Sequence, residues 1–276
     1  MLSLDTVFAV IDPTTEHQRA LDRAIRIAKF ANAKLHAFVS IYSDLDTQDE
    51  DALRQVETSR YELWLDRILN PAREEGLEIT SQIEWQKDWF AAIAPAAKAV
   101  NADLIIKPSR AHTASERLLM KSSDLALFRT AQCPVLLAKS EASNLTHKVL
   151  MAIDARRDDE KYKSIVEKIL KFGRDIRDCY EDGQLFAVHS YTDQEEYVHV
   201  RDLAKLTGLD TENVFVIGDE PEQAIARKAG EIDAQVIVIG LSTKGTLRNR
   251  VFGSTGEWLL NNLDCDLLVI FPEELR

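Results

Sequence analysis

Short, continuous runs of apolar residues alternate along this chain with longer segments in which apolar residues recur at helical spacing. The short runs are typical of strands buried on both faces, and the longer segments are typical of amphipathic helices. Strands are predicted at residues 4–11, 34–42, 77–84, 103–107, 134–138, 147–153, 184–190, 213–217, 235–239 and 266–271. Helices are predicted at residues 15–32, 48–75, 88–101, 116–131, 158–181, 194–206, 220–233 and 254–263.

The second predicted helix is the longest, and it must cover part of a sheet. Its apolar side chains at helical spacing predict the face that does so. These are Leu53, Val56, Trp64 and Ile68.

The alternating pattern occurs twice. An apolar run that stops on an aspartate, residues 7–12, recurs at residues 149–154, and two further runs, 102–106 and 133–137, recur at 234–238 and 265–269. Cys133 and Cys265 are 132 positions apart, whereas Asp12 and Asp154 are 142 apart. The second copy has therefore lost about ten residues, mainly from its second helix, and the chain is a duplicated domain.

Strands that alternate with helices predict an α/β protein with parallel sheets and right-handed crossovers. We expect two tandem, doubly wound, five-stranded domains at residues 1–140 and 145–276, joined by the polar segment 140–144. In such sheets a ligand binds beyond the carboxyl ends of the strands, where the strand order reverses. Asp12, Asp154 and the segments after residues 107 and 239 therefore lie where a site is expected.

Composition removes several classes of function. The net charge of −12 disfavours nucleic-acid binding, because phosphate neutralisation requires a basic face. The start of the chain shows no export signal, and no run reaches the roughly 18 apolar residues of a membrane span. Three cysteines without a paired motif indicate a reducing compartment, so a cytoplasmic location is expected. Six scattered histidines predict no specific metal site.

The strongest candidate for chemistry follows the fourth strand of the second half. Gly240 is followed after two residues by Thr243, and nine residues later Gly253, Ser254 and Thr255 open the last helix. Glycines, hydroxyls and the free N–H groups of a helix start together suit a phosphate. The loop also carries Lys244, Arg248 and Arg250 and no acid. A second interpretation stays open, in which the glycines only turn the chain and Ser254 or Thr255 caps the helix.

This spacing resembles the glycine-rich nucleotide loop of the universal stress protein family, with threonine in place of the second glycine. The strand ending in aspartate, the Ala-Asp-Leu-Ile strand and the Cys-Pro-Val-Leu strand are similar to the same family. Two copies in one chain resemble its tandem, E-type members. The resemblance implies an adenine nucleotide alpha hydrolase-like fold and an ATP site, with magnesium, in the second half. The residues implied are Asp154, Ser190, Gly240, Thr243, Gly253, Ser254 and Thr255.

The first half departs from that loop. Pro108, Lys121 and Asp124 stand at the positions of Gly240, Gly253 and Gly256. Proline removes an N–H donor, and an aspartate repels phosphate. We therefore expect no nucleotide in the first half, although it keeps Asp12. For Asp154 itself the sequence leaves two roles open, a ligand contact and a cap on the following loop or helix.

The resulting hypothesis is a cytoplasmic stress-response binding module with an ATP site in the second half. The resemblance also implies that the two fifth strands pair edge to edge, as in a dimer of single domains, and that the chain can form a homodimer. The sequence contains no recognisable nucleophile, base and orienting residue, so at most slow, incidental ATP hydrolysis is expected. The alternative is an ATP-independent scaffold or carrier with another, apolar ligand in the first half.

Overall fold

We describe the protein from a computed structural model, which covers residues 4–42, 50–88, 90–109, 123–139, 147–157, 159–241 and 253–272. The chain forms two compact units, one ending at Pro108 and the other beginning at Ser109. The predicted domain boundaries, 1–140 and 145–276, follow the sequence repeat instead and stay a prediction.

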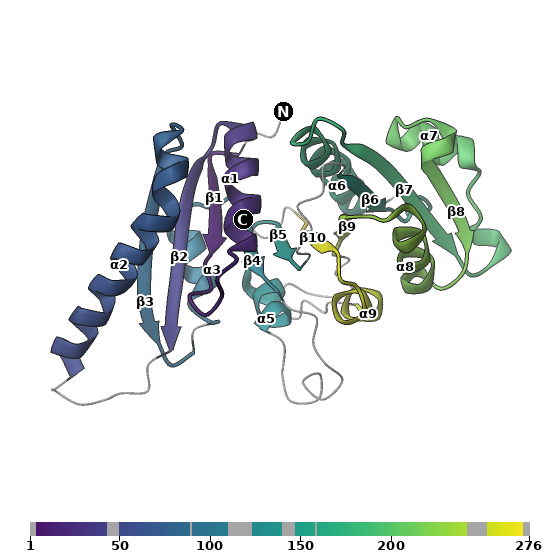
Figure 1. Cartoon of the computed structure of the whole chain (residues 1–276). Coiled ribbons are helices and arrows are strands. Elements are labelled where there is room, and N and C mark those ends of the chain that lie inside the picture. Colours follow the sequence, from purple (N-terminus) through teal and green to yellow (C-terminus); the bar gives the residue numbers. More distant parts are fainter. Residues whose placement is uncertain are drawn as a thin grey trace. The chain divides into compact units, whose positions relative to one another are not determined.

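Every predicted strand and helix is present (Figure 1). The strands are β1 (Thr6–Val10), β2 (Lys34–Tyr42), β3 (Ile79–Gln86), β4 (Leu104–Pro108), β5 (Val135–Ala138), β6 (Lys148–Ala152), β7 (Gln184–Tyr191), β8 (Val214–Gly218), β9 (Val236–Gly240) and β10 (Asp266–Ile270). The helices are α1 (Arg19–Ala31), α2 (Glu50–Glu74), α3 (Ile93–Ala99), α5 (Ser123–Thr130), α6 (Glu160–Asp178), α7 (Val200–Thr207), α8 (Pro221–Ile232) and α9 (Ser254–Asn262), with a short 3₁₀ turn, η1 (Gln194–Glu196).

In the unit that ends at Pro108, four parallel strands pair in the order β3, β2, β1, β4. Val7, Phe8 and Ala9 of β1 are fully buried, as are Leu35 and Ala37 of β2. Burial on both faces explains why these strands are continuous apolar runs.

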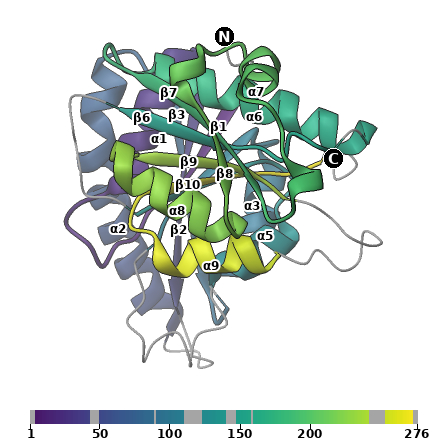
Figure 2. The same ribbon diagram turned by 90° about the vertical axis from the view of Figure 1, so that its right-hand side faces the viewer.

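The unit that begins at Ser109 repeats this order as β8, β7, β6, β9, with β10 beside β9, all parallel. Figure 2 shows α6 and α7 on one side of these strands and α8 and α9 on the other. Right-handed crossovers require this division, since the chain first moves outward from β6 and then returns past it. The order therefore reverses between β6 and β9, and this α/β fold with its tandem layout is the one predicted.

The predicted pairing of the two fifth strands is confirmed, because β5 and β10 pair in antiparallel orientation. Lys139, which follows β5, is 6% exposed. Its backbone N–H donates to Asp266 Oδ1 at 2.9 Å, and its Nζ donates to Leu263 O at 2.9 Å and to Leu260 O. These carbonyls end α9, so a cation caps the negative end of that helix. Burial lowers the pKa of the Lys139 ammonium below its ordinary value.

The repeat places Phe271 in the second copy where Lys139 stands in the first. Phe271 packs against Phe128 of α5 with ring centroids 6.3 Å apart. The residues that follow the paired strands β5 and β10 therefore make different contacts: Lys139 forms polar contacts with α9, and Phe271 packs against an aromatic ring of α5.

The predicted contact face of α2 is wrong at Val56, which is 59% exposed. Trp64 and Ile68 are half-buried, and the side chain of Leu53 lies outside the described residues. The buried side chains among those described in α2 are Leu65, Leu69 and Ala72, which are 1%, 0% and 3% exposed. A helix with apolar residues on several faces can pack against a sheet through more than one of them. Tertiary packing, and not the periodicity of the sequence, then decides which face is buried.

Candidate functional site

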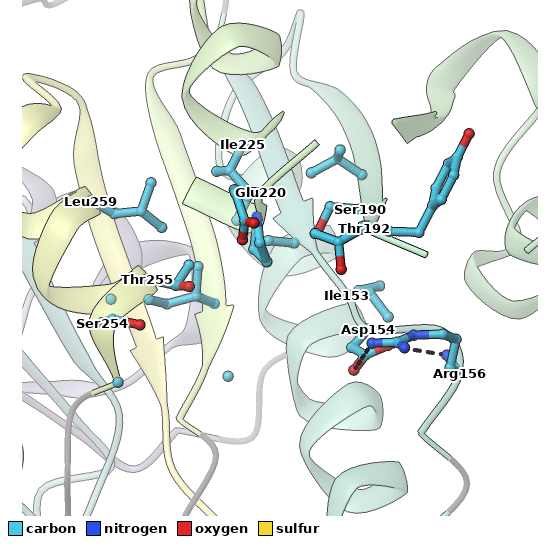
Figure 3. Close-up of a pocket in the computed structure, with 18 of the residues that line it drawn as sticks. Ile153, Asp154, Arg156, Ser190, Thr192, Glu220, Ile225, Ser254, Thr255 and Leu259 are labelled. Carbon is cyan, nitrogen blue, oxygen red and sulfur yellow. Dashed lines mark hydrogen bonds and ion pairs between the residues drawn. The ribbon is translucent and has the colours of Figure 1, made fainter. Parts of the chain in front are cut away.

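A cavity of about 420 Å³ lies where the strand order reverses, at the carboxyl ends of β6, β7 and β9. Helices α8 and α9 complete its wall (Figure 3). Six of the seven residues predicted for the nucleotide site line it, from four separate stretches of chain. They are Asp154, Ser190, Gly240, Gly253, Ser254 and Thr255. The structure thus brings together residues that are up to about a hundred positions apart, as the topology requires.

One side of the cavity is a charged cluster of Asp154, Arg156 and Glu196. The Arg156 guanidinium lies between the two carboxylates: its Nε is 3.1 Å from Asp154 Oδ1, and its Nη1 pairs with Glu196 Oε1. Glu196 also accepts from the backbone N–H of Thr192 at 3.0 Å and from its hydroxyl at 3.1 Å. The Thr192 N–H, its hydroxyl and then Arg156 lower the pKa of Glu196 to about 2. The cluster ties the loop after β6 to the loop after β7.

Hydrogen bonds to the side chains of Tyr162 and His189 fix the backbone at residues 153 and 154. The N–H of Asp154 donates to the Tyr162 hydroxyl at 2.6 Å, and burial raises the pKa of that hydroxyl to about 12. The N-cap of α6 is Asp159, which accepts from Tyr162 N at 3.0 Å. His189, 1% exposed, lies with Nδ1 3.3 Å from Ile153 O. Asp154 therefore does not cap α6, and its carboxylate is turned to Arg156 at the cavity wall.

The opposite side of the cavity is the start of α9. Gly253 is its N-cap, with φ −62° and ψ 164°, and among the described residues no side chain caps the helix. A Cβ built on Gly253 would meet no atom of the described residues within 4 Å. Ser254 is exposed there. The Thr255 hydroxyl donates to Glu222 Oε2 of α8 at 2.9 Å.

Gly240 is a glycine for a reason that the sequence analysis did not give. A Cβ at this position would overlap Cγ2 of Ile165 in α6 and would lie 3.1 Å from Cδ1 of Ile169. The residue therefore lets α6 pack directly on the end of β9. Its closest neighbour is this helix, although it also borders the cavity.

The equivalent positions of the first repeat are in part built differently. Asp12 Oδ1 accepts from the N–H of Thr14 at 2.9 Å, as Asp154 Oδ1 accepts from the N–H of Arg156 at 3.3 Å, but the side chain that binds Asp12 is the Thr14 hydroxyl, at 2.6 Å. At the start of α5, Asp124 is 2% exposed and accepts from the Ser109 hydroxyl at 2.6 Å. A buried carboxylate thus stands in the first turn of α5, where α9 has Gly256.

Several predicted residues lie outside the described residues. They are Thr243, Lys244, Arg248 and Arg250 of the second-half loop, and Lys121 of the first half. The sequence analysis in turn missed Arg156, Thr192, Glu196 and Glu222. No spacing rule links these polar residues, because tertiary packing alone brings their loops together.

Two further searches of the described residues bear on the predictions. Within them, no three His, Cys, Asp or Glu side chains gather in a way that could hold a metal ion. Among the helices of the described segments, none is sufficiently long and apolar to cross a membrane.

The parallel α/β units, the duplicated strand order and the cavity at the point of reversal define the class of protein. A sequence model of the universal stress protein family matches residues 4–139 and again residues 147–270. The chain belongs to the universal stress protein family.

Relatives with the same two-domain length point to the tandem members. The chain is 24% identical to universal stress protein E of Salmonella typhi over 100% of this chain and 97% of the relative. It is 22% identical to universal stress protein E of Photorhabdus laumondii over 99% and 96% of the two chains.

Solved structures agree in fold. A structure from Pseudomonas aeruginosa UCBPP-PA14, described as that of a universal stress protein, matches with a TM-score of 0.83 at 24% identity, covering 99% of this chain and 95% of that one. A universal stress protein from Archaeoglobus fulgidus matches with a TM-score of 0.74 at 17% identity, covering 98% and 97%.

Proposed function

We propose that this tandem universal stress protein is a cytoplasmic stress-response binding module and that the cavity of its C-terminal half binds ATP together with magnesium. The observation that carries the proposal is the convergence of six predicted residues on one cavity where the strand order reverses. Ligands of doubly wound folds bind at such points.

The two sides of the cavity suit the two ends of a nucleotide. The first turn of α9 offers backbone N–H groups, the positive end of the peptide dipoles and the hydroxyls of Ser254 and Thr255. The described residues leave room for a phosphate beside Gly253, since none of their atoms lies within 4 Å of a Cβ built there. On the other side, the Asp154 carboxylate and Ser190 supply polar groups for a nucleoside. Magnesium would enter with the phosphates, and its role is to neutralise their charge.

Binding without turnover is the activity that we propose. The carboxylates that line the cavity beside β6 and β7, Asp154 and Glu196, are both held by Arg156. An ion-paired carboxylate whose pKa is lowered, as for Glu196, is a poor general base. Any hydrolysis of ATP would therefore be slow and incidental. Homodimer formation remains a prediction from the family resemblance.

Titration calorimetry of the full chain with MgATP tests the proposal. We expect saturable binding by the wild type and binding at least about tenfold weaker in Gly253→Asp, because the new carboxylate would repel the phosphates. Gly230→Asp is the matched control: Gly230 is an exposed helix residue with equally open space around it, and the charge change is the same. Its affinity should equal that of the wild type.

A different result of the titrations would contradict ATP binding. If the wild type gives no heat at millimolar MgATP and Gly253→Asp behaves like it, the alternative of an ATP-independent scaffold or carrier is favoured. Mass spectrometry of small molecules that co-purify with the protein provides an independent check, since a retained nucleotide would be detected directly.

A further inference from the structure

Glu222 lies beside the cavity and contacts Thr255, one of the residues that line it. It belongs to the first turn of α8, and its Oε2 accepts the Thr255 hydroxyl at 2.9 Å. Thr255 is in the first turn of α9 and lines the cavity, as do Glu220 and Pro221 immediately before Glu222. Figure 2 shows α8 and α9 side by side, which is why one helix can reach the start of the other.

A carboxylate at a helix start satisfies the same groups that a phosphate would satisfy. Both are anionic acceptors, and both are stabilised by the positive end of the peptide dipoles. A Thr hydroxyl has a single proton to donate, so Thr255 cannot donate to Glu222 and to a phosphate together. Two anions at neighbouring positions also repel each other.

The position of Glu222 allows its side chain to move away from Thr255. Its side chain is half-buried, and it reaches Thr255 from a different helix. Asp124 in the first repeat contrasts with it, because that carboxylate is 2% exposed and is part of α5 itself. A rotation about side-chain bonds can move Glu222 away from α9 toward solvent, whereas Asp124 is enclosed by other atoms and would have to be exposed by a larger rearrangement.

We propose that Glu222 is an intramolecular competitor for the phosphate end of the cavity, so that phosphate-bearing ligands must displace it and nucleosides need not. This inference rests on the proposed nucleotide site and adds a selectivity to it. The carboxylate weakens binding of ATP relative to adenosine, and it holds α8 against α9 when no phosphate is bound.

The test compares adenosine, ATP and inorganic tripolyphosphate in calorimetric titrations of the full chain at constant magnesium. Glu222→Gln keeps an acceptor for Thr255 but removes the charge. It should raise the affinity for ATP and for tripolyphosphate about tenfold. The affinity for adenosine should stay unchanged, and so should the melting temperature of the free protein. Glu231→Gln is the control, since it makes the same charge change at the far end of α8.

Each outcome decides the question. Selective strengthening of phosphate ligands in Glu222→Gln supports the inference, including the case in which only this variant binds ATP. If the wild type binds ATP and Glu222→Gln binds it equally well, the inference fails and the proposed function stands. If Glu222→Gln binds ATP more weakly, Glu222 assists the ligand, and the inference also fails. Absence of binding by all three ligands in both proteins overturns the site and the inference together.

Discussion

The last helices of the two repeats, α5 and α9, differ most where they begin. In the first turn of α5, the buried Asp124 accepts from Ser109, whereas in the first turn of α9 Thr255 donates to Glu222 of a neighbouring helix. The acid in the first turn of α9 itself, Glu257, is half-buried. The comparison teaches that the carboxylate of such a pair can lie on the duplicated helix itself, as in α5, or on a neighbouring helix, as in α9.

The two helices also differ where they end. The carbonyls of α9 receive the ammonium of Lys139, whereas Phe128 near the end of α5 packs against Phe271. A cation at the carboxyl end of a helix stabilises its dipole. The helix that forms the wall of the cavity is therefore braced at the end away from the ligand, and its counterpart is held by apolar packing.

The largest expected effect comes from removing the fixed carboxylate. Asp124→Ala should lower the free energy of unfolding by about 2 to 3 kcal/mol, because a buried, hydrogen-bonded carboxylate is lost and its donors are left in the core. Glu222→Gln should change it by less than about 0.5 kcal/mol, as for other solvent-accessible sites. Urea unfolding of both variants measures the difference. Equal destabilisation would show that the two carboxylates are equally embedded.

The next effect concerns Lys139, whose ammonium caps the carboxyl end of α9. Lys139→Met keeps most of the side-chain volume but leaves the carbonyls of Leu260 and Leu263 without their donor, at a cost of about 2 kcal/mol. Phe271→Leu, at the equivalent position of the joint, should cost about 1 kcal/mol from lost packing. Unfolding in urea gives both values. A Lys139→Met variant as stable as the wild type would mean that the desolvation of the ammonium cancels its hydrogen bonds.

A smaller effect is expected at the end of β9. Gly240→Ala should destabilise the protein by about 1 to 2 kcal/mol, because its methyl group overlaps Ile165. Added to Ile165→Val, which removes the δ-methyl and not Cγ2, Gly240→Ala should cost about as much as in the wild type, whereas added to Ile165→Ala it should cost less. Gly253→Ala is the control: it meets no described atom and should cost only about 0.5 kcal/mol, because glycine is preferred to alanine at an N-cap. Thermal unfolding of these proteins separates packing from any effect on a ligand.

The smallest effect is a pH dependence. The folded pKa of Glu196 is about 2 and its ordinary value is 4.5, so the stabilisation from its charged form is complete above pH 4.5 and is lost as the pH falls toward 2. Glu196→Gln should therefore lose less stability than the wild type between pH 4.5 and pH 3. Unfolding titrations at several pH values measure this, with the exposed neighbour Glu195→Gln as control. Identical acid profiles for wild type and Glu196→Gln would contradict the lowered pKa.

The sequence predicted the strands well because burial on both faces of a sheet requires a continuous apolar run. It predicted the doubly wound fold because crossovers between parallel strands are right-handed. It placed the cavity for the same reason, since the topology alone brings Asp154, Ser190 and Gly253 to one edge. The contact face of α2 was missed because Leu65 and Leu69 compete there with Trp64 and Ile68 for the sheet. Arg156, Glu196 and Glu222 were missed because polar residues on separate loops leave no periodic signal.

The joint between β5 and β10 has a practical consequence for dissecting the chain. A fragment that began at the polar segment 140–144 would carry β10 with one edge of backbone groups exposed, and α9 would lack its lysine. A fragment beginning at Ser109 retains both. The repeat in the sequence and the compact units of the structure therefore divide the chain at different places, and a fragment has to follow the second division.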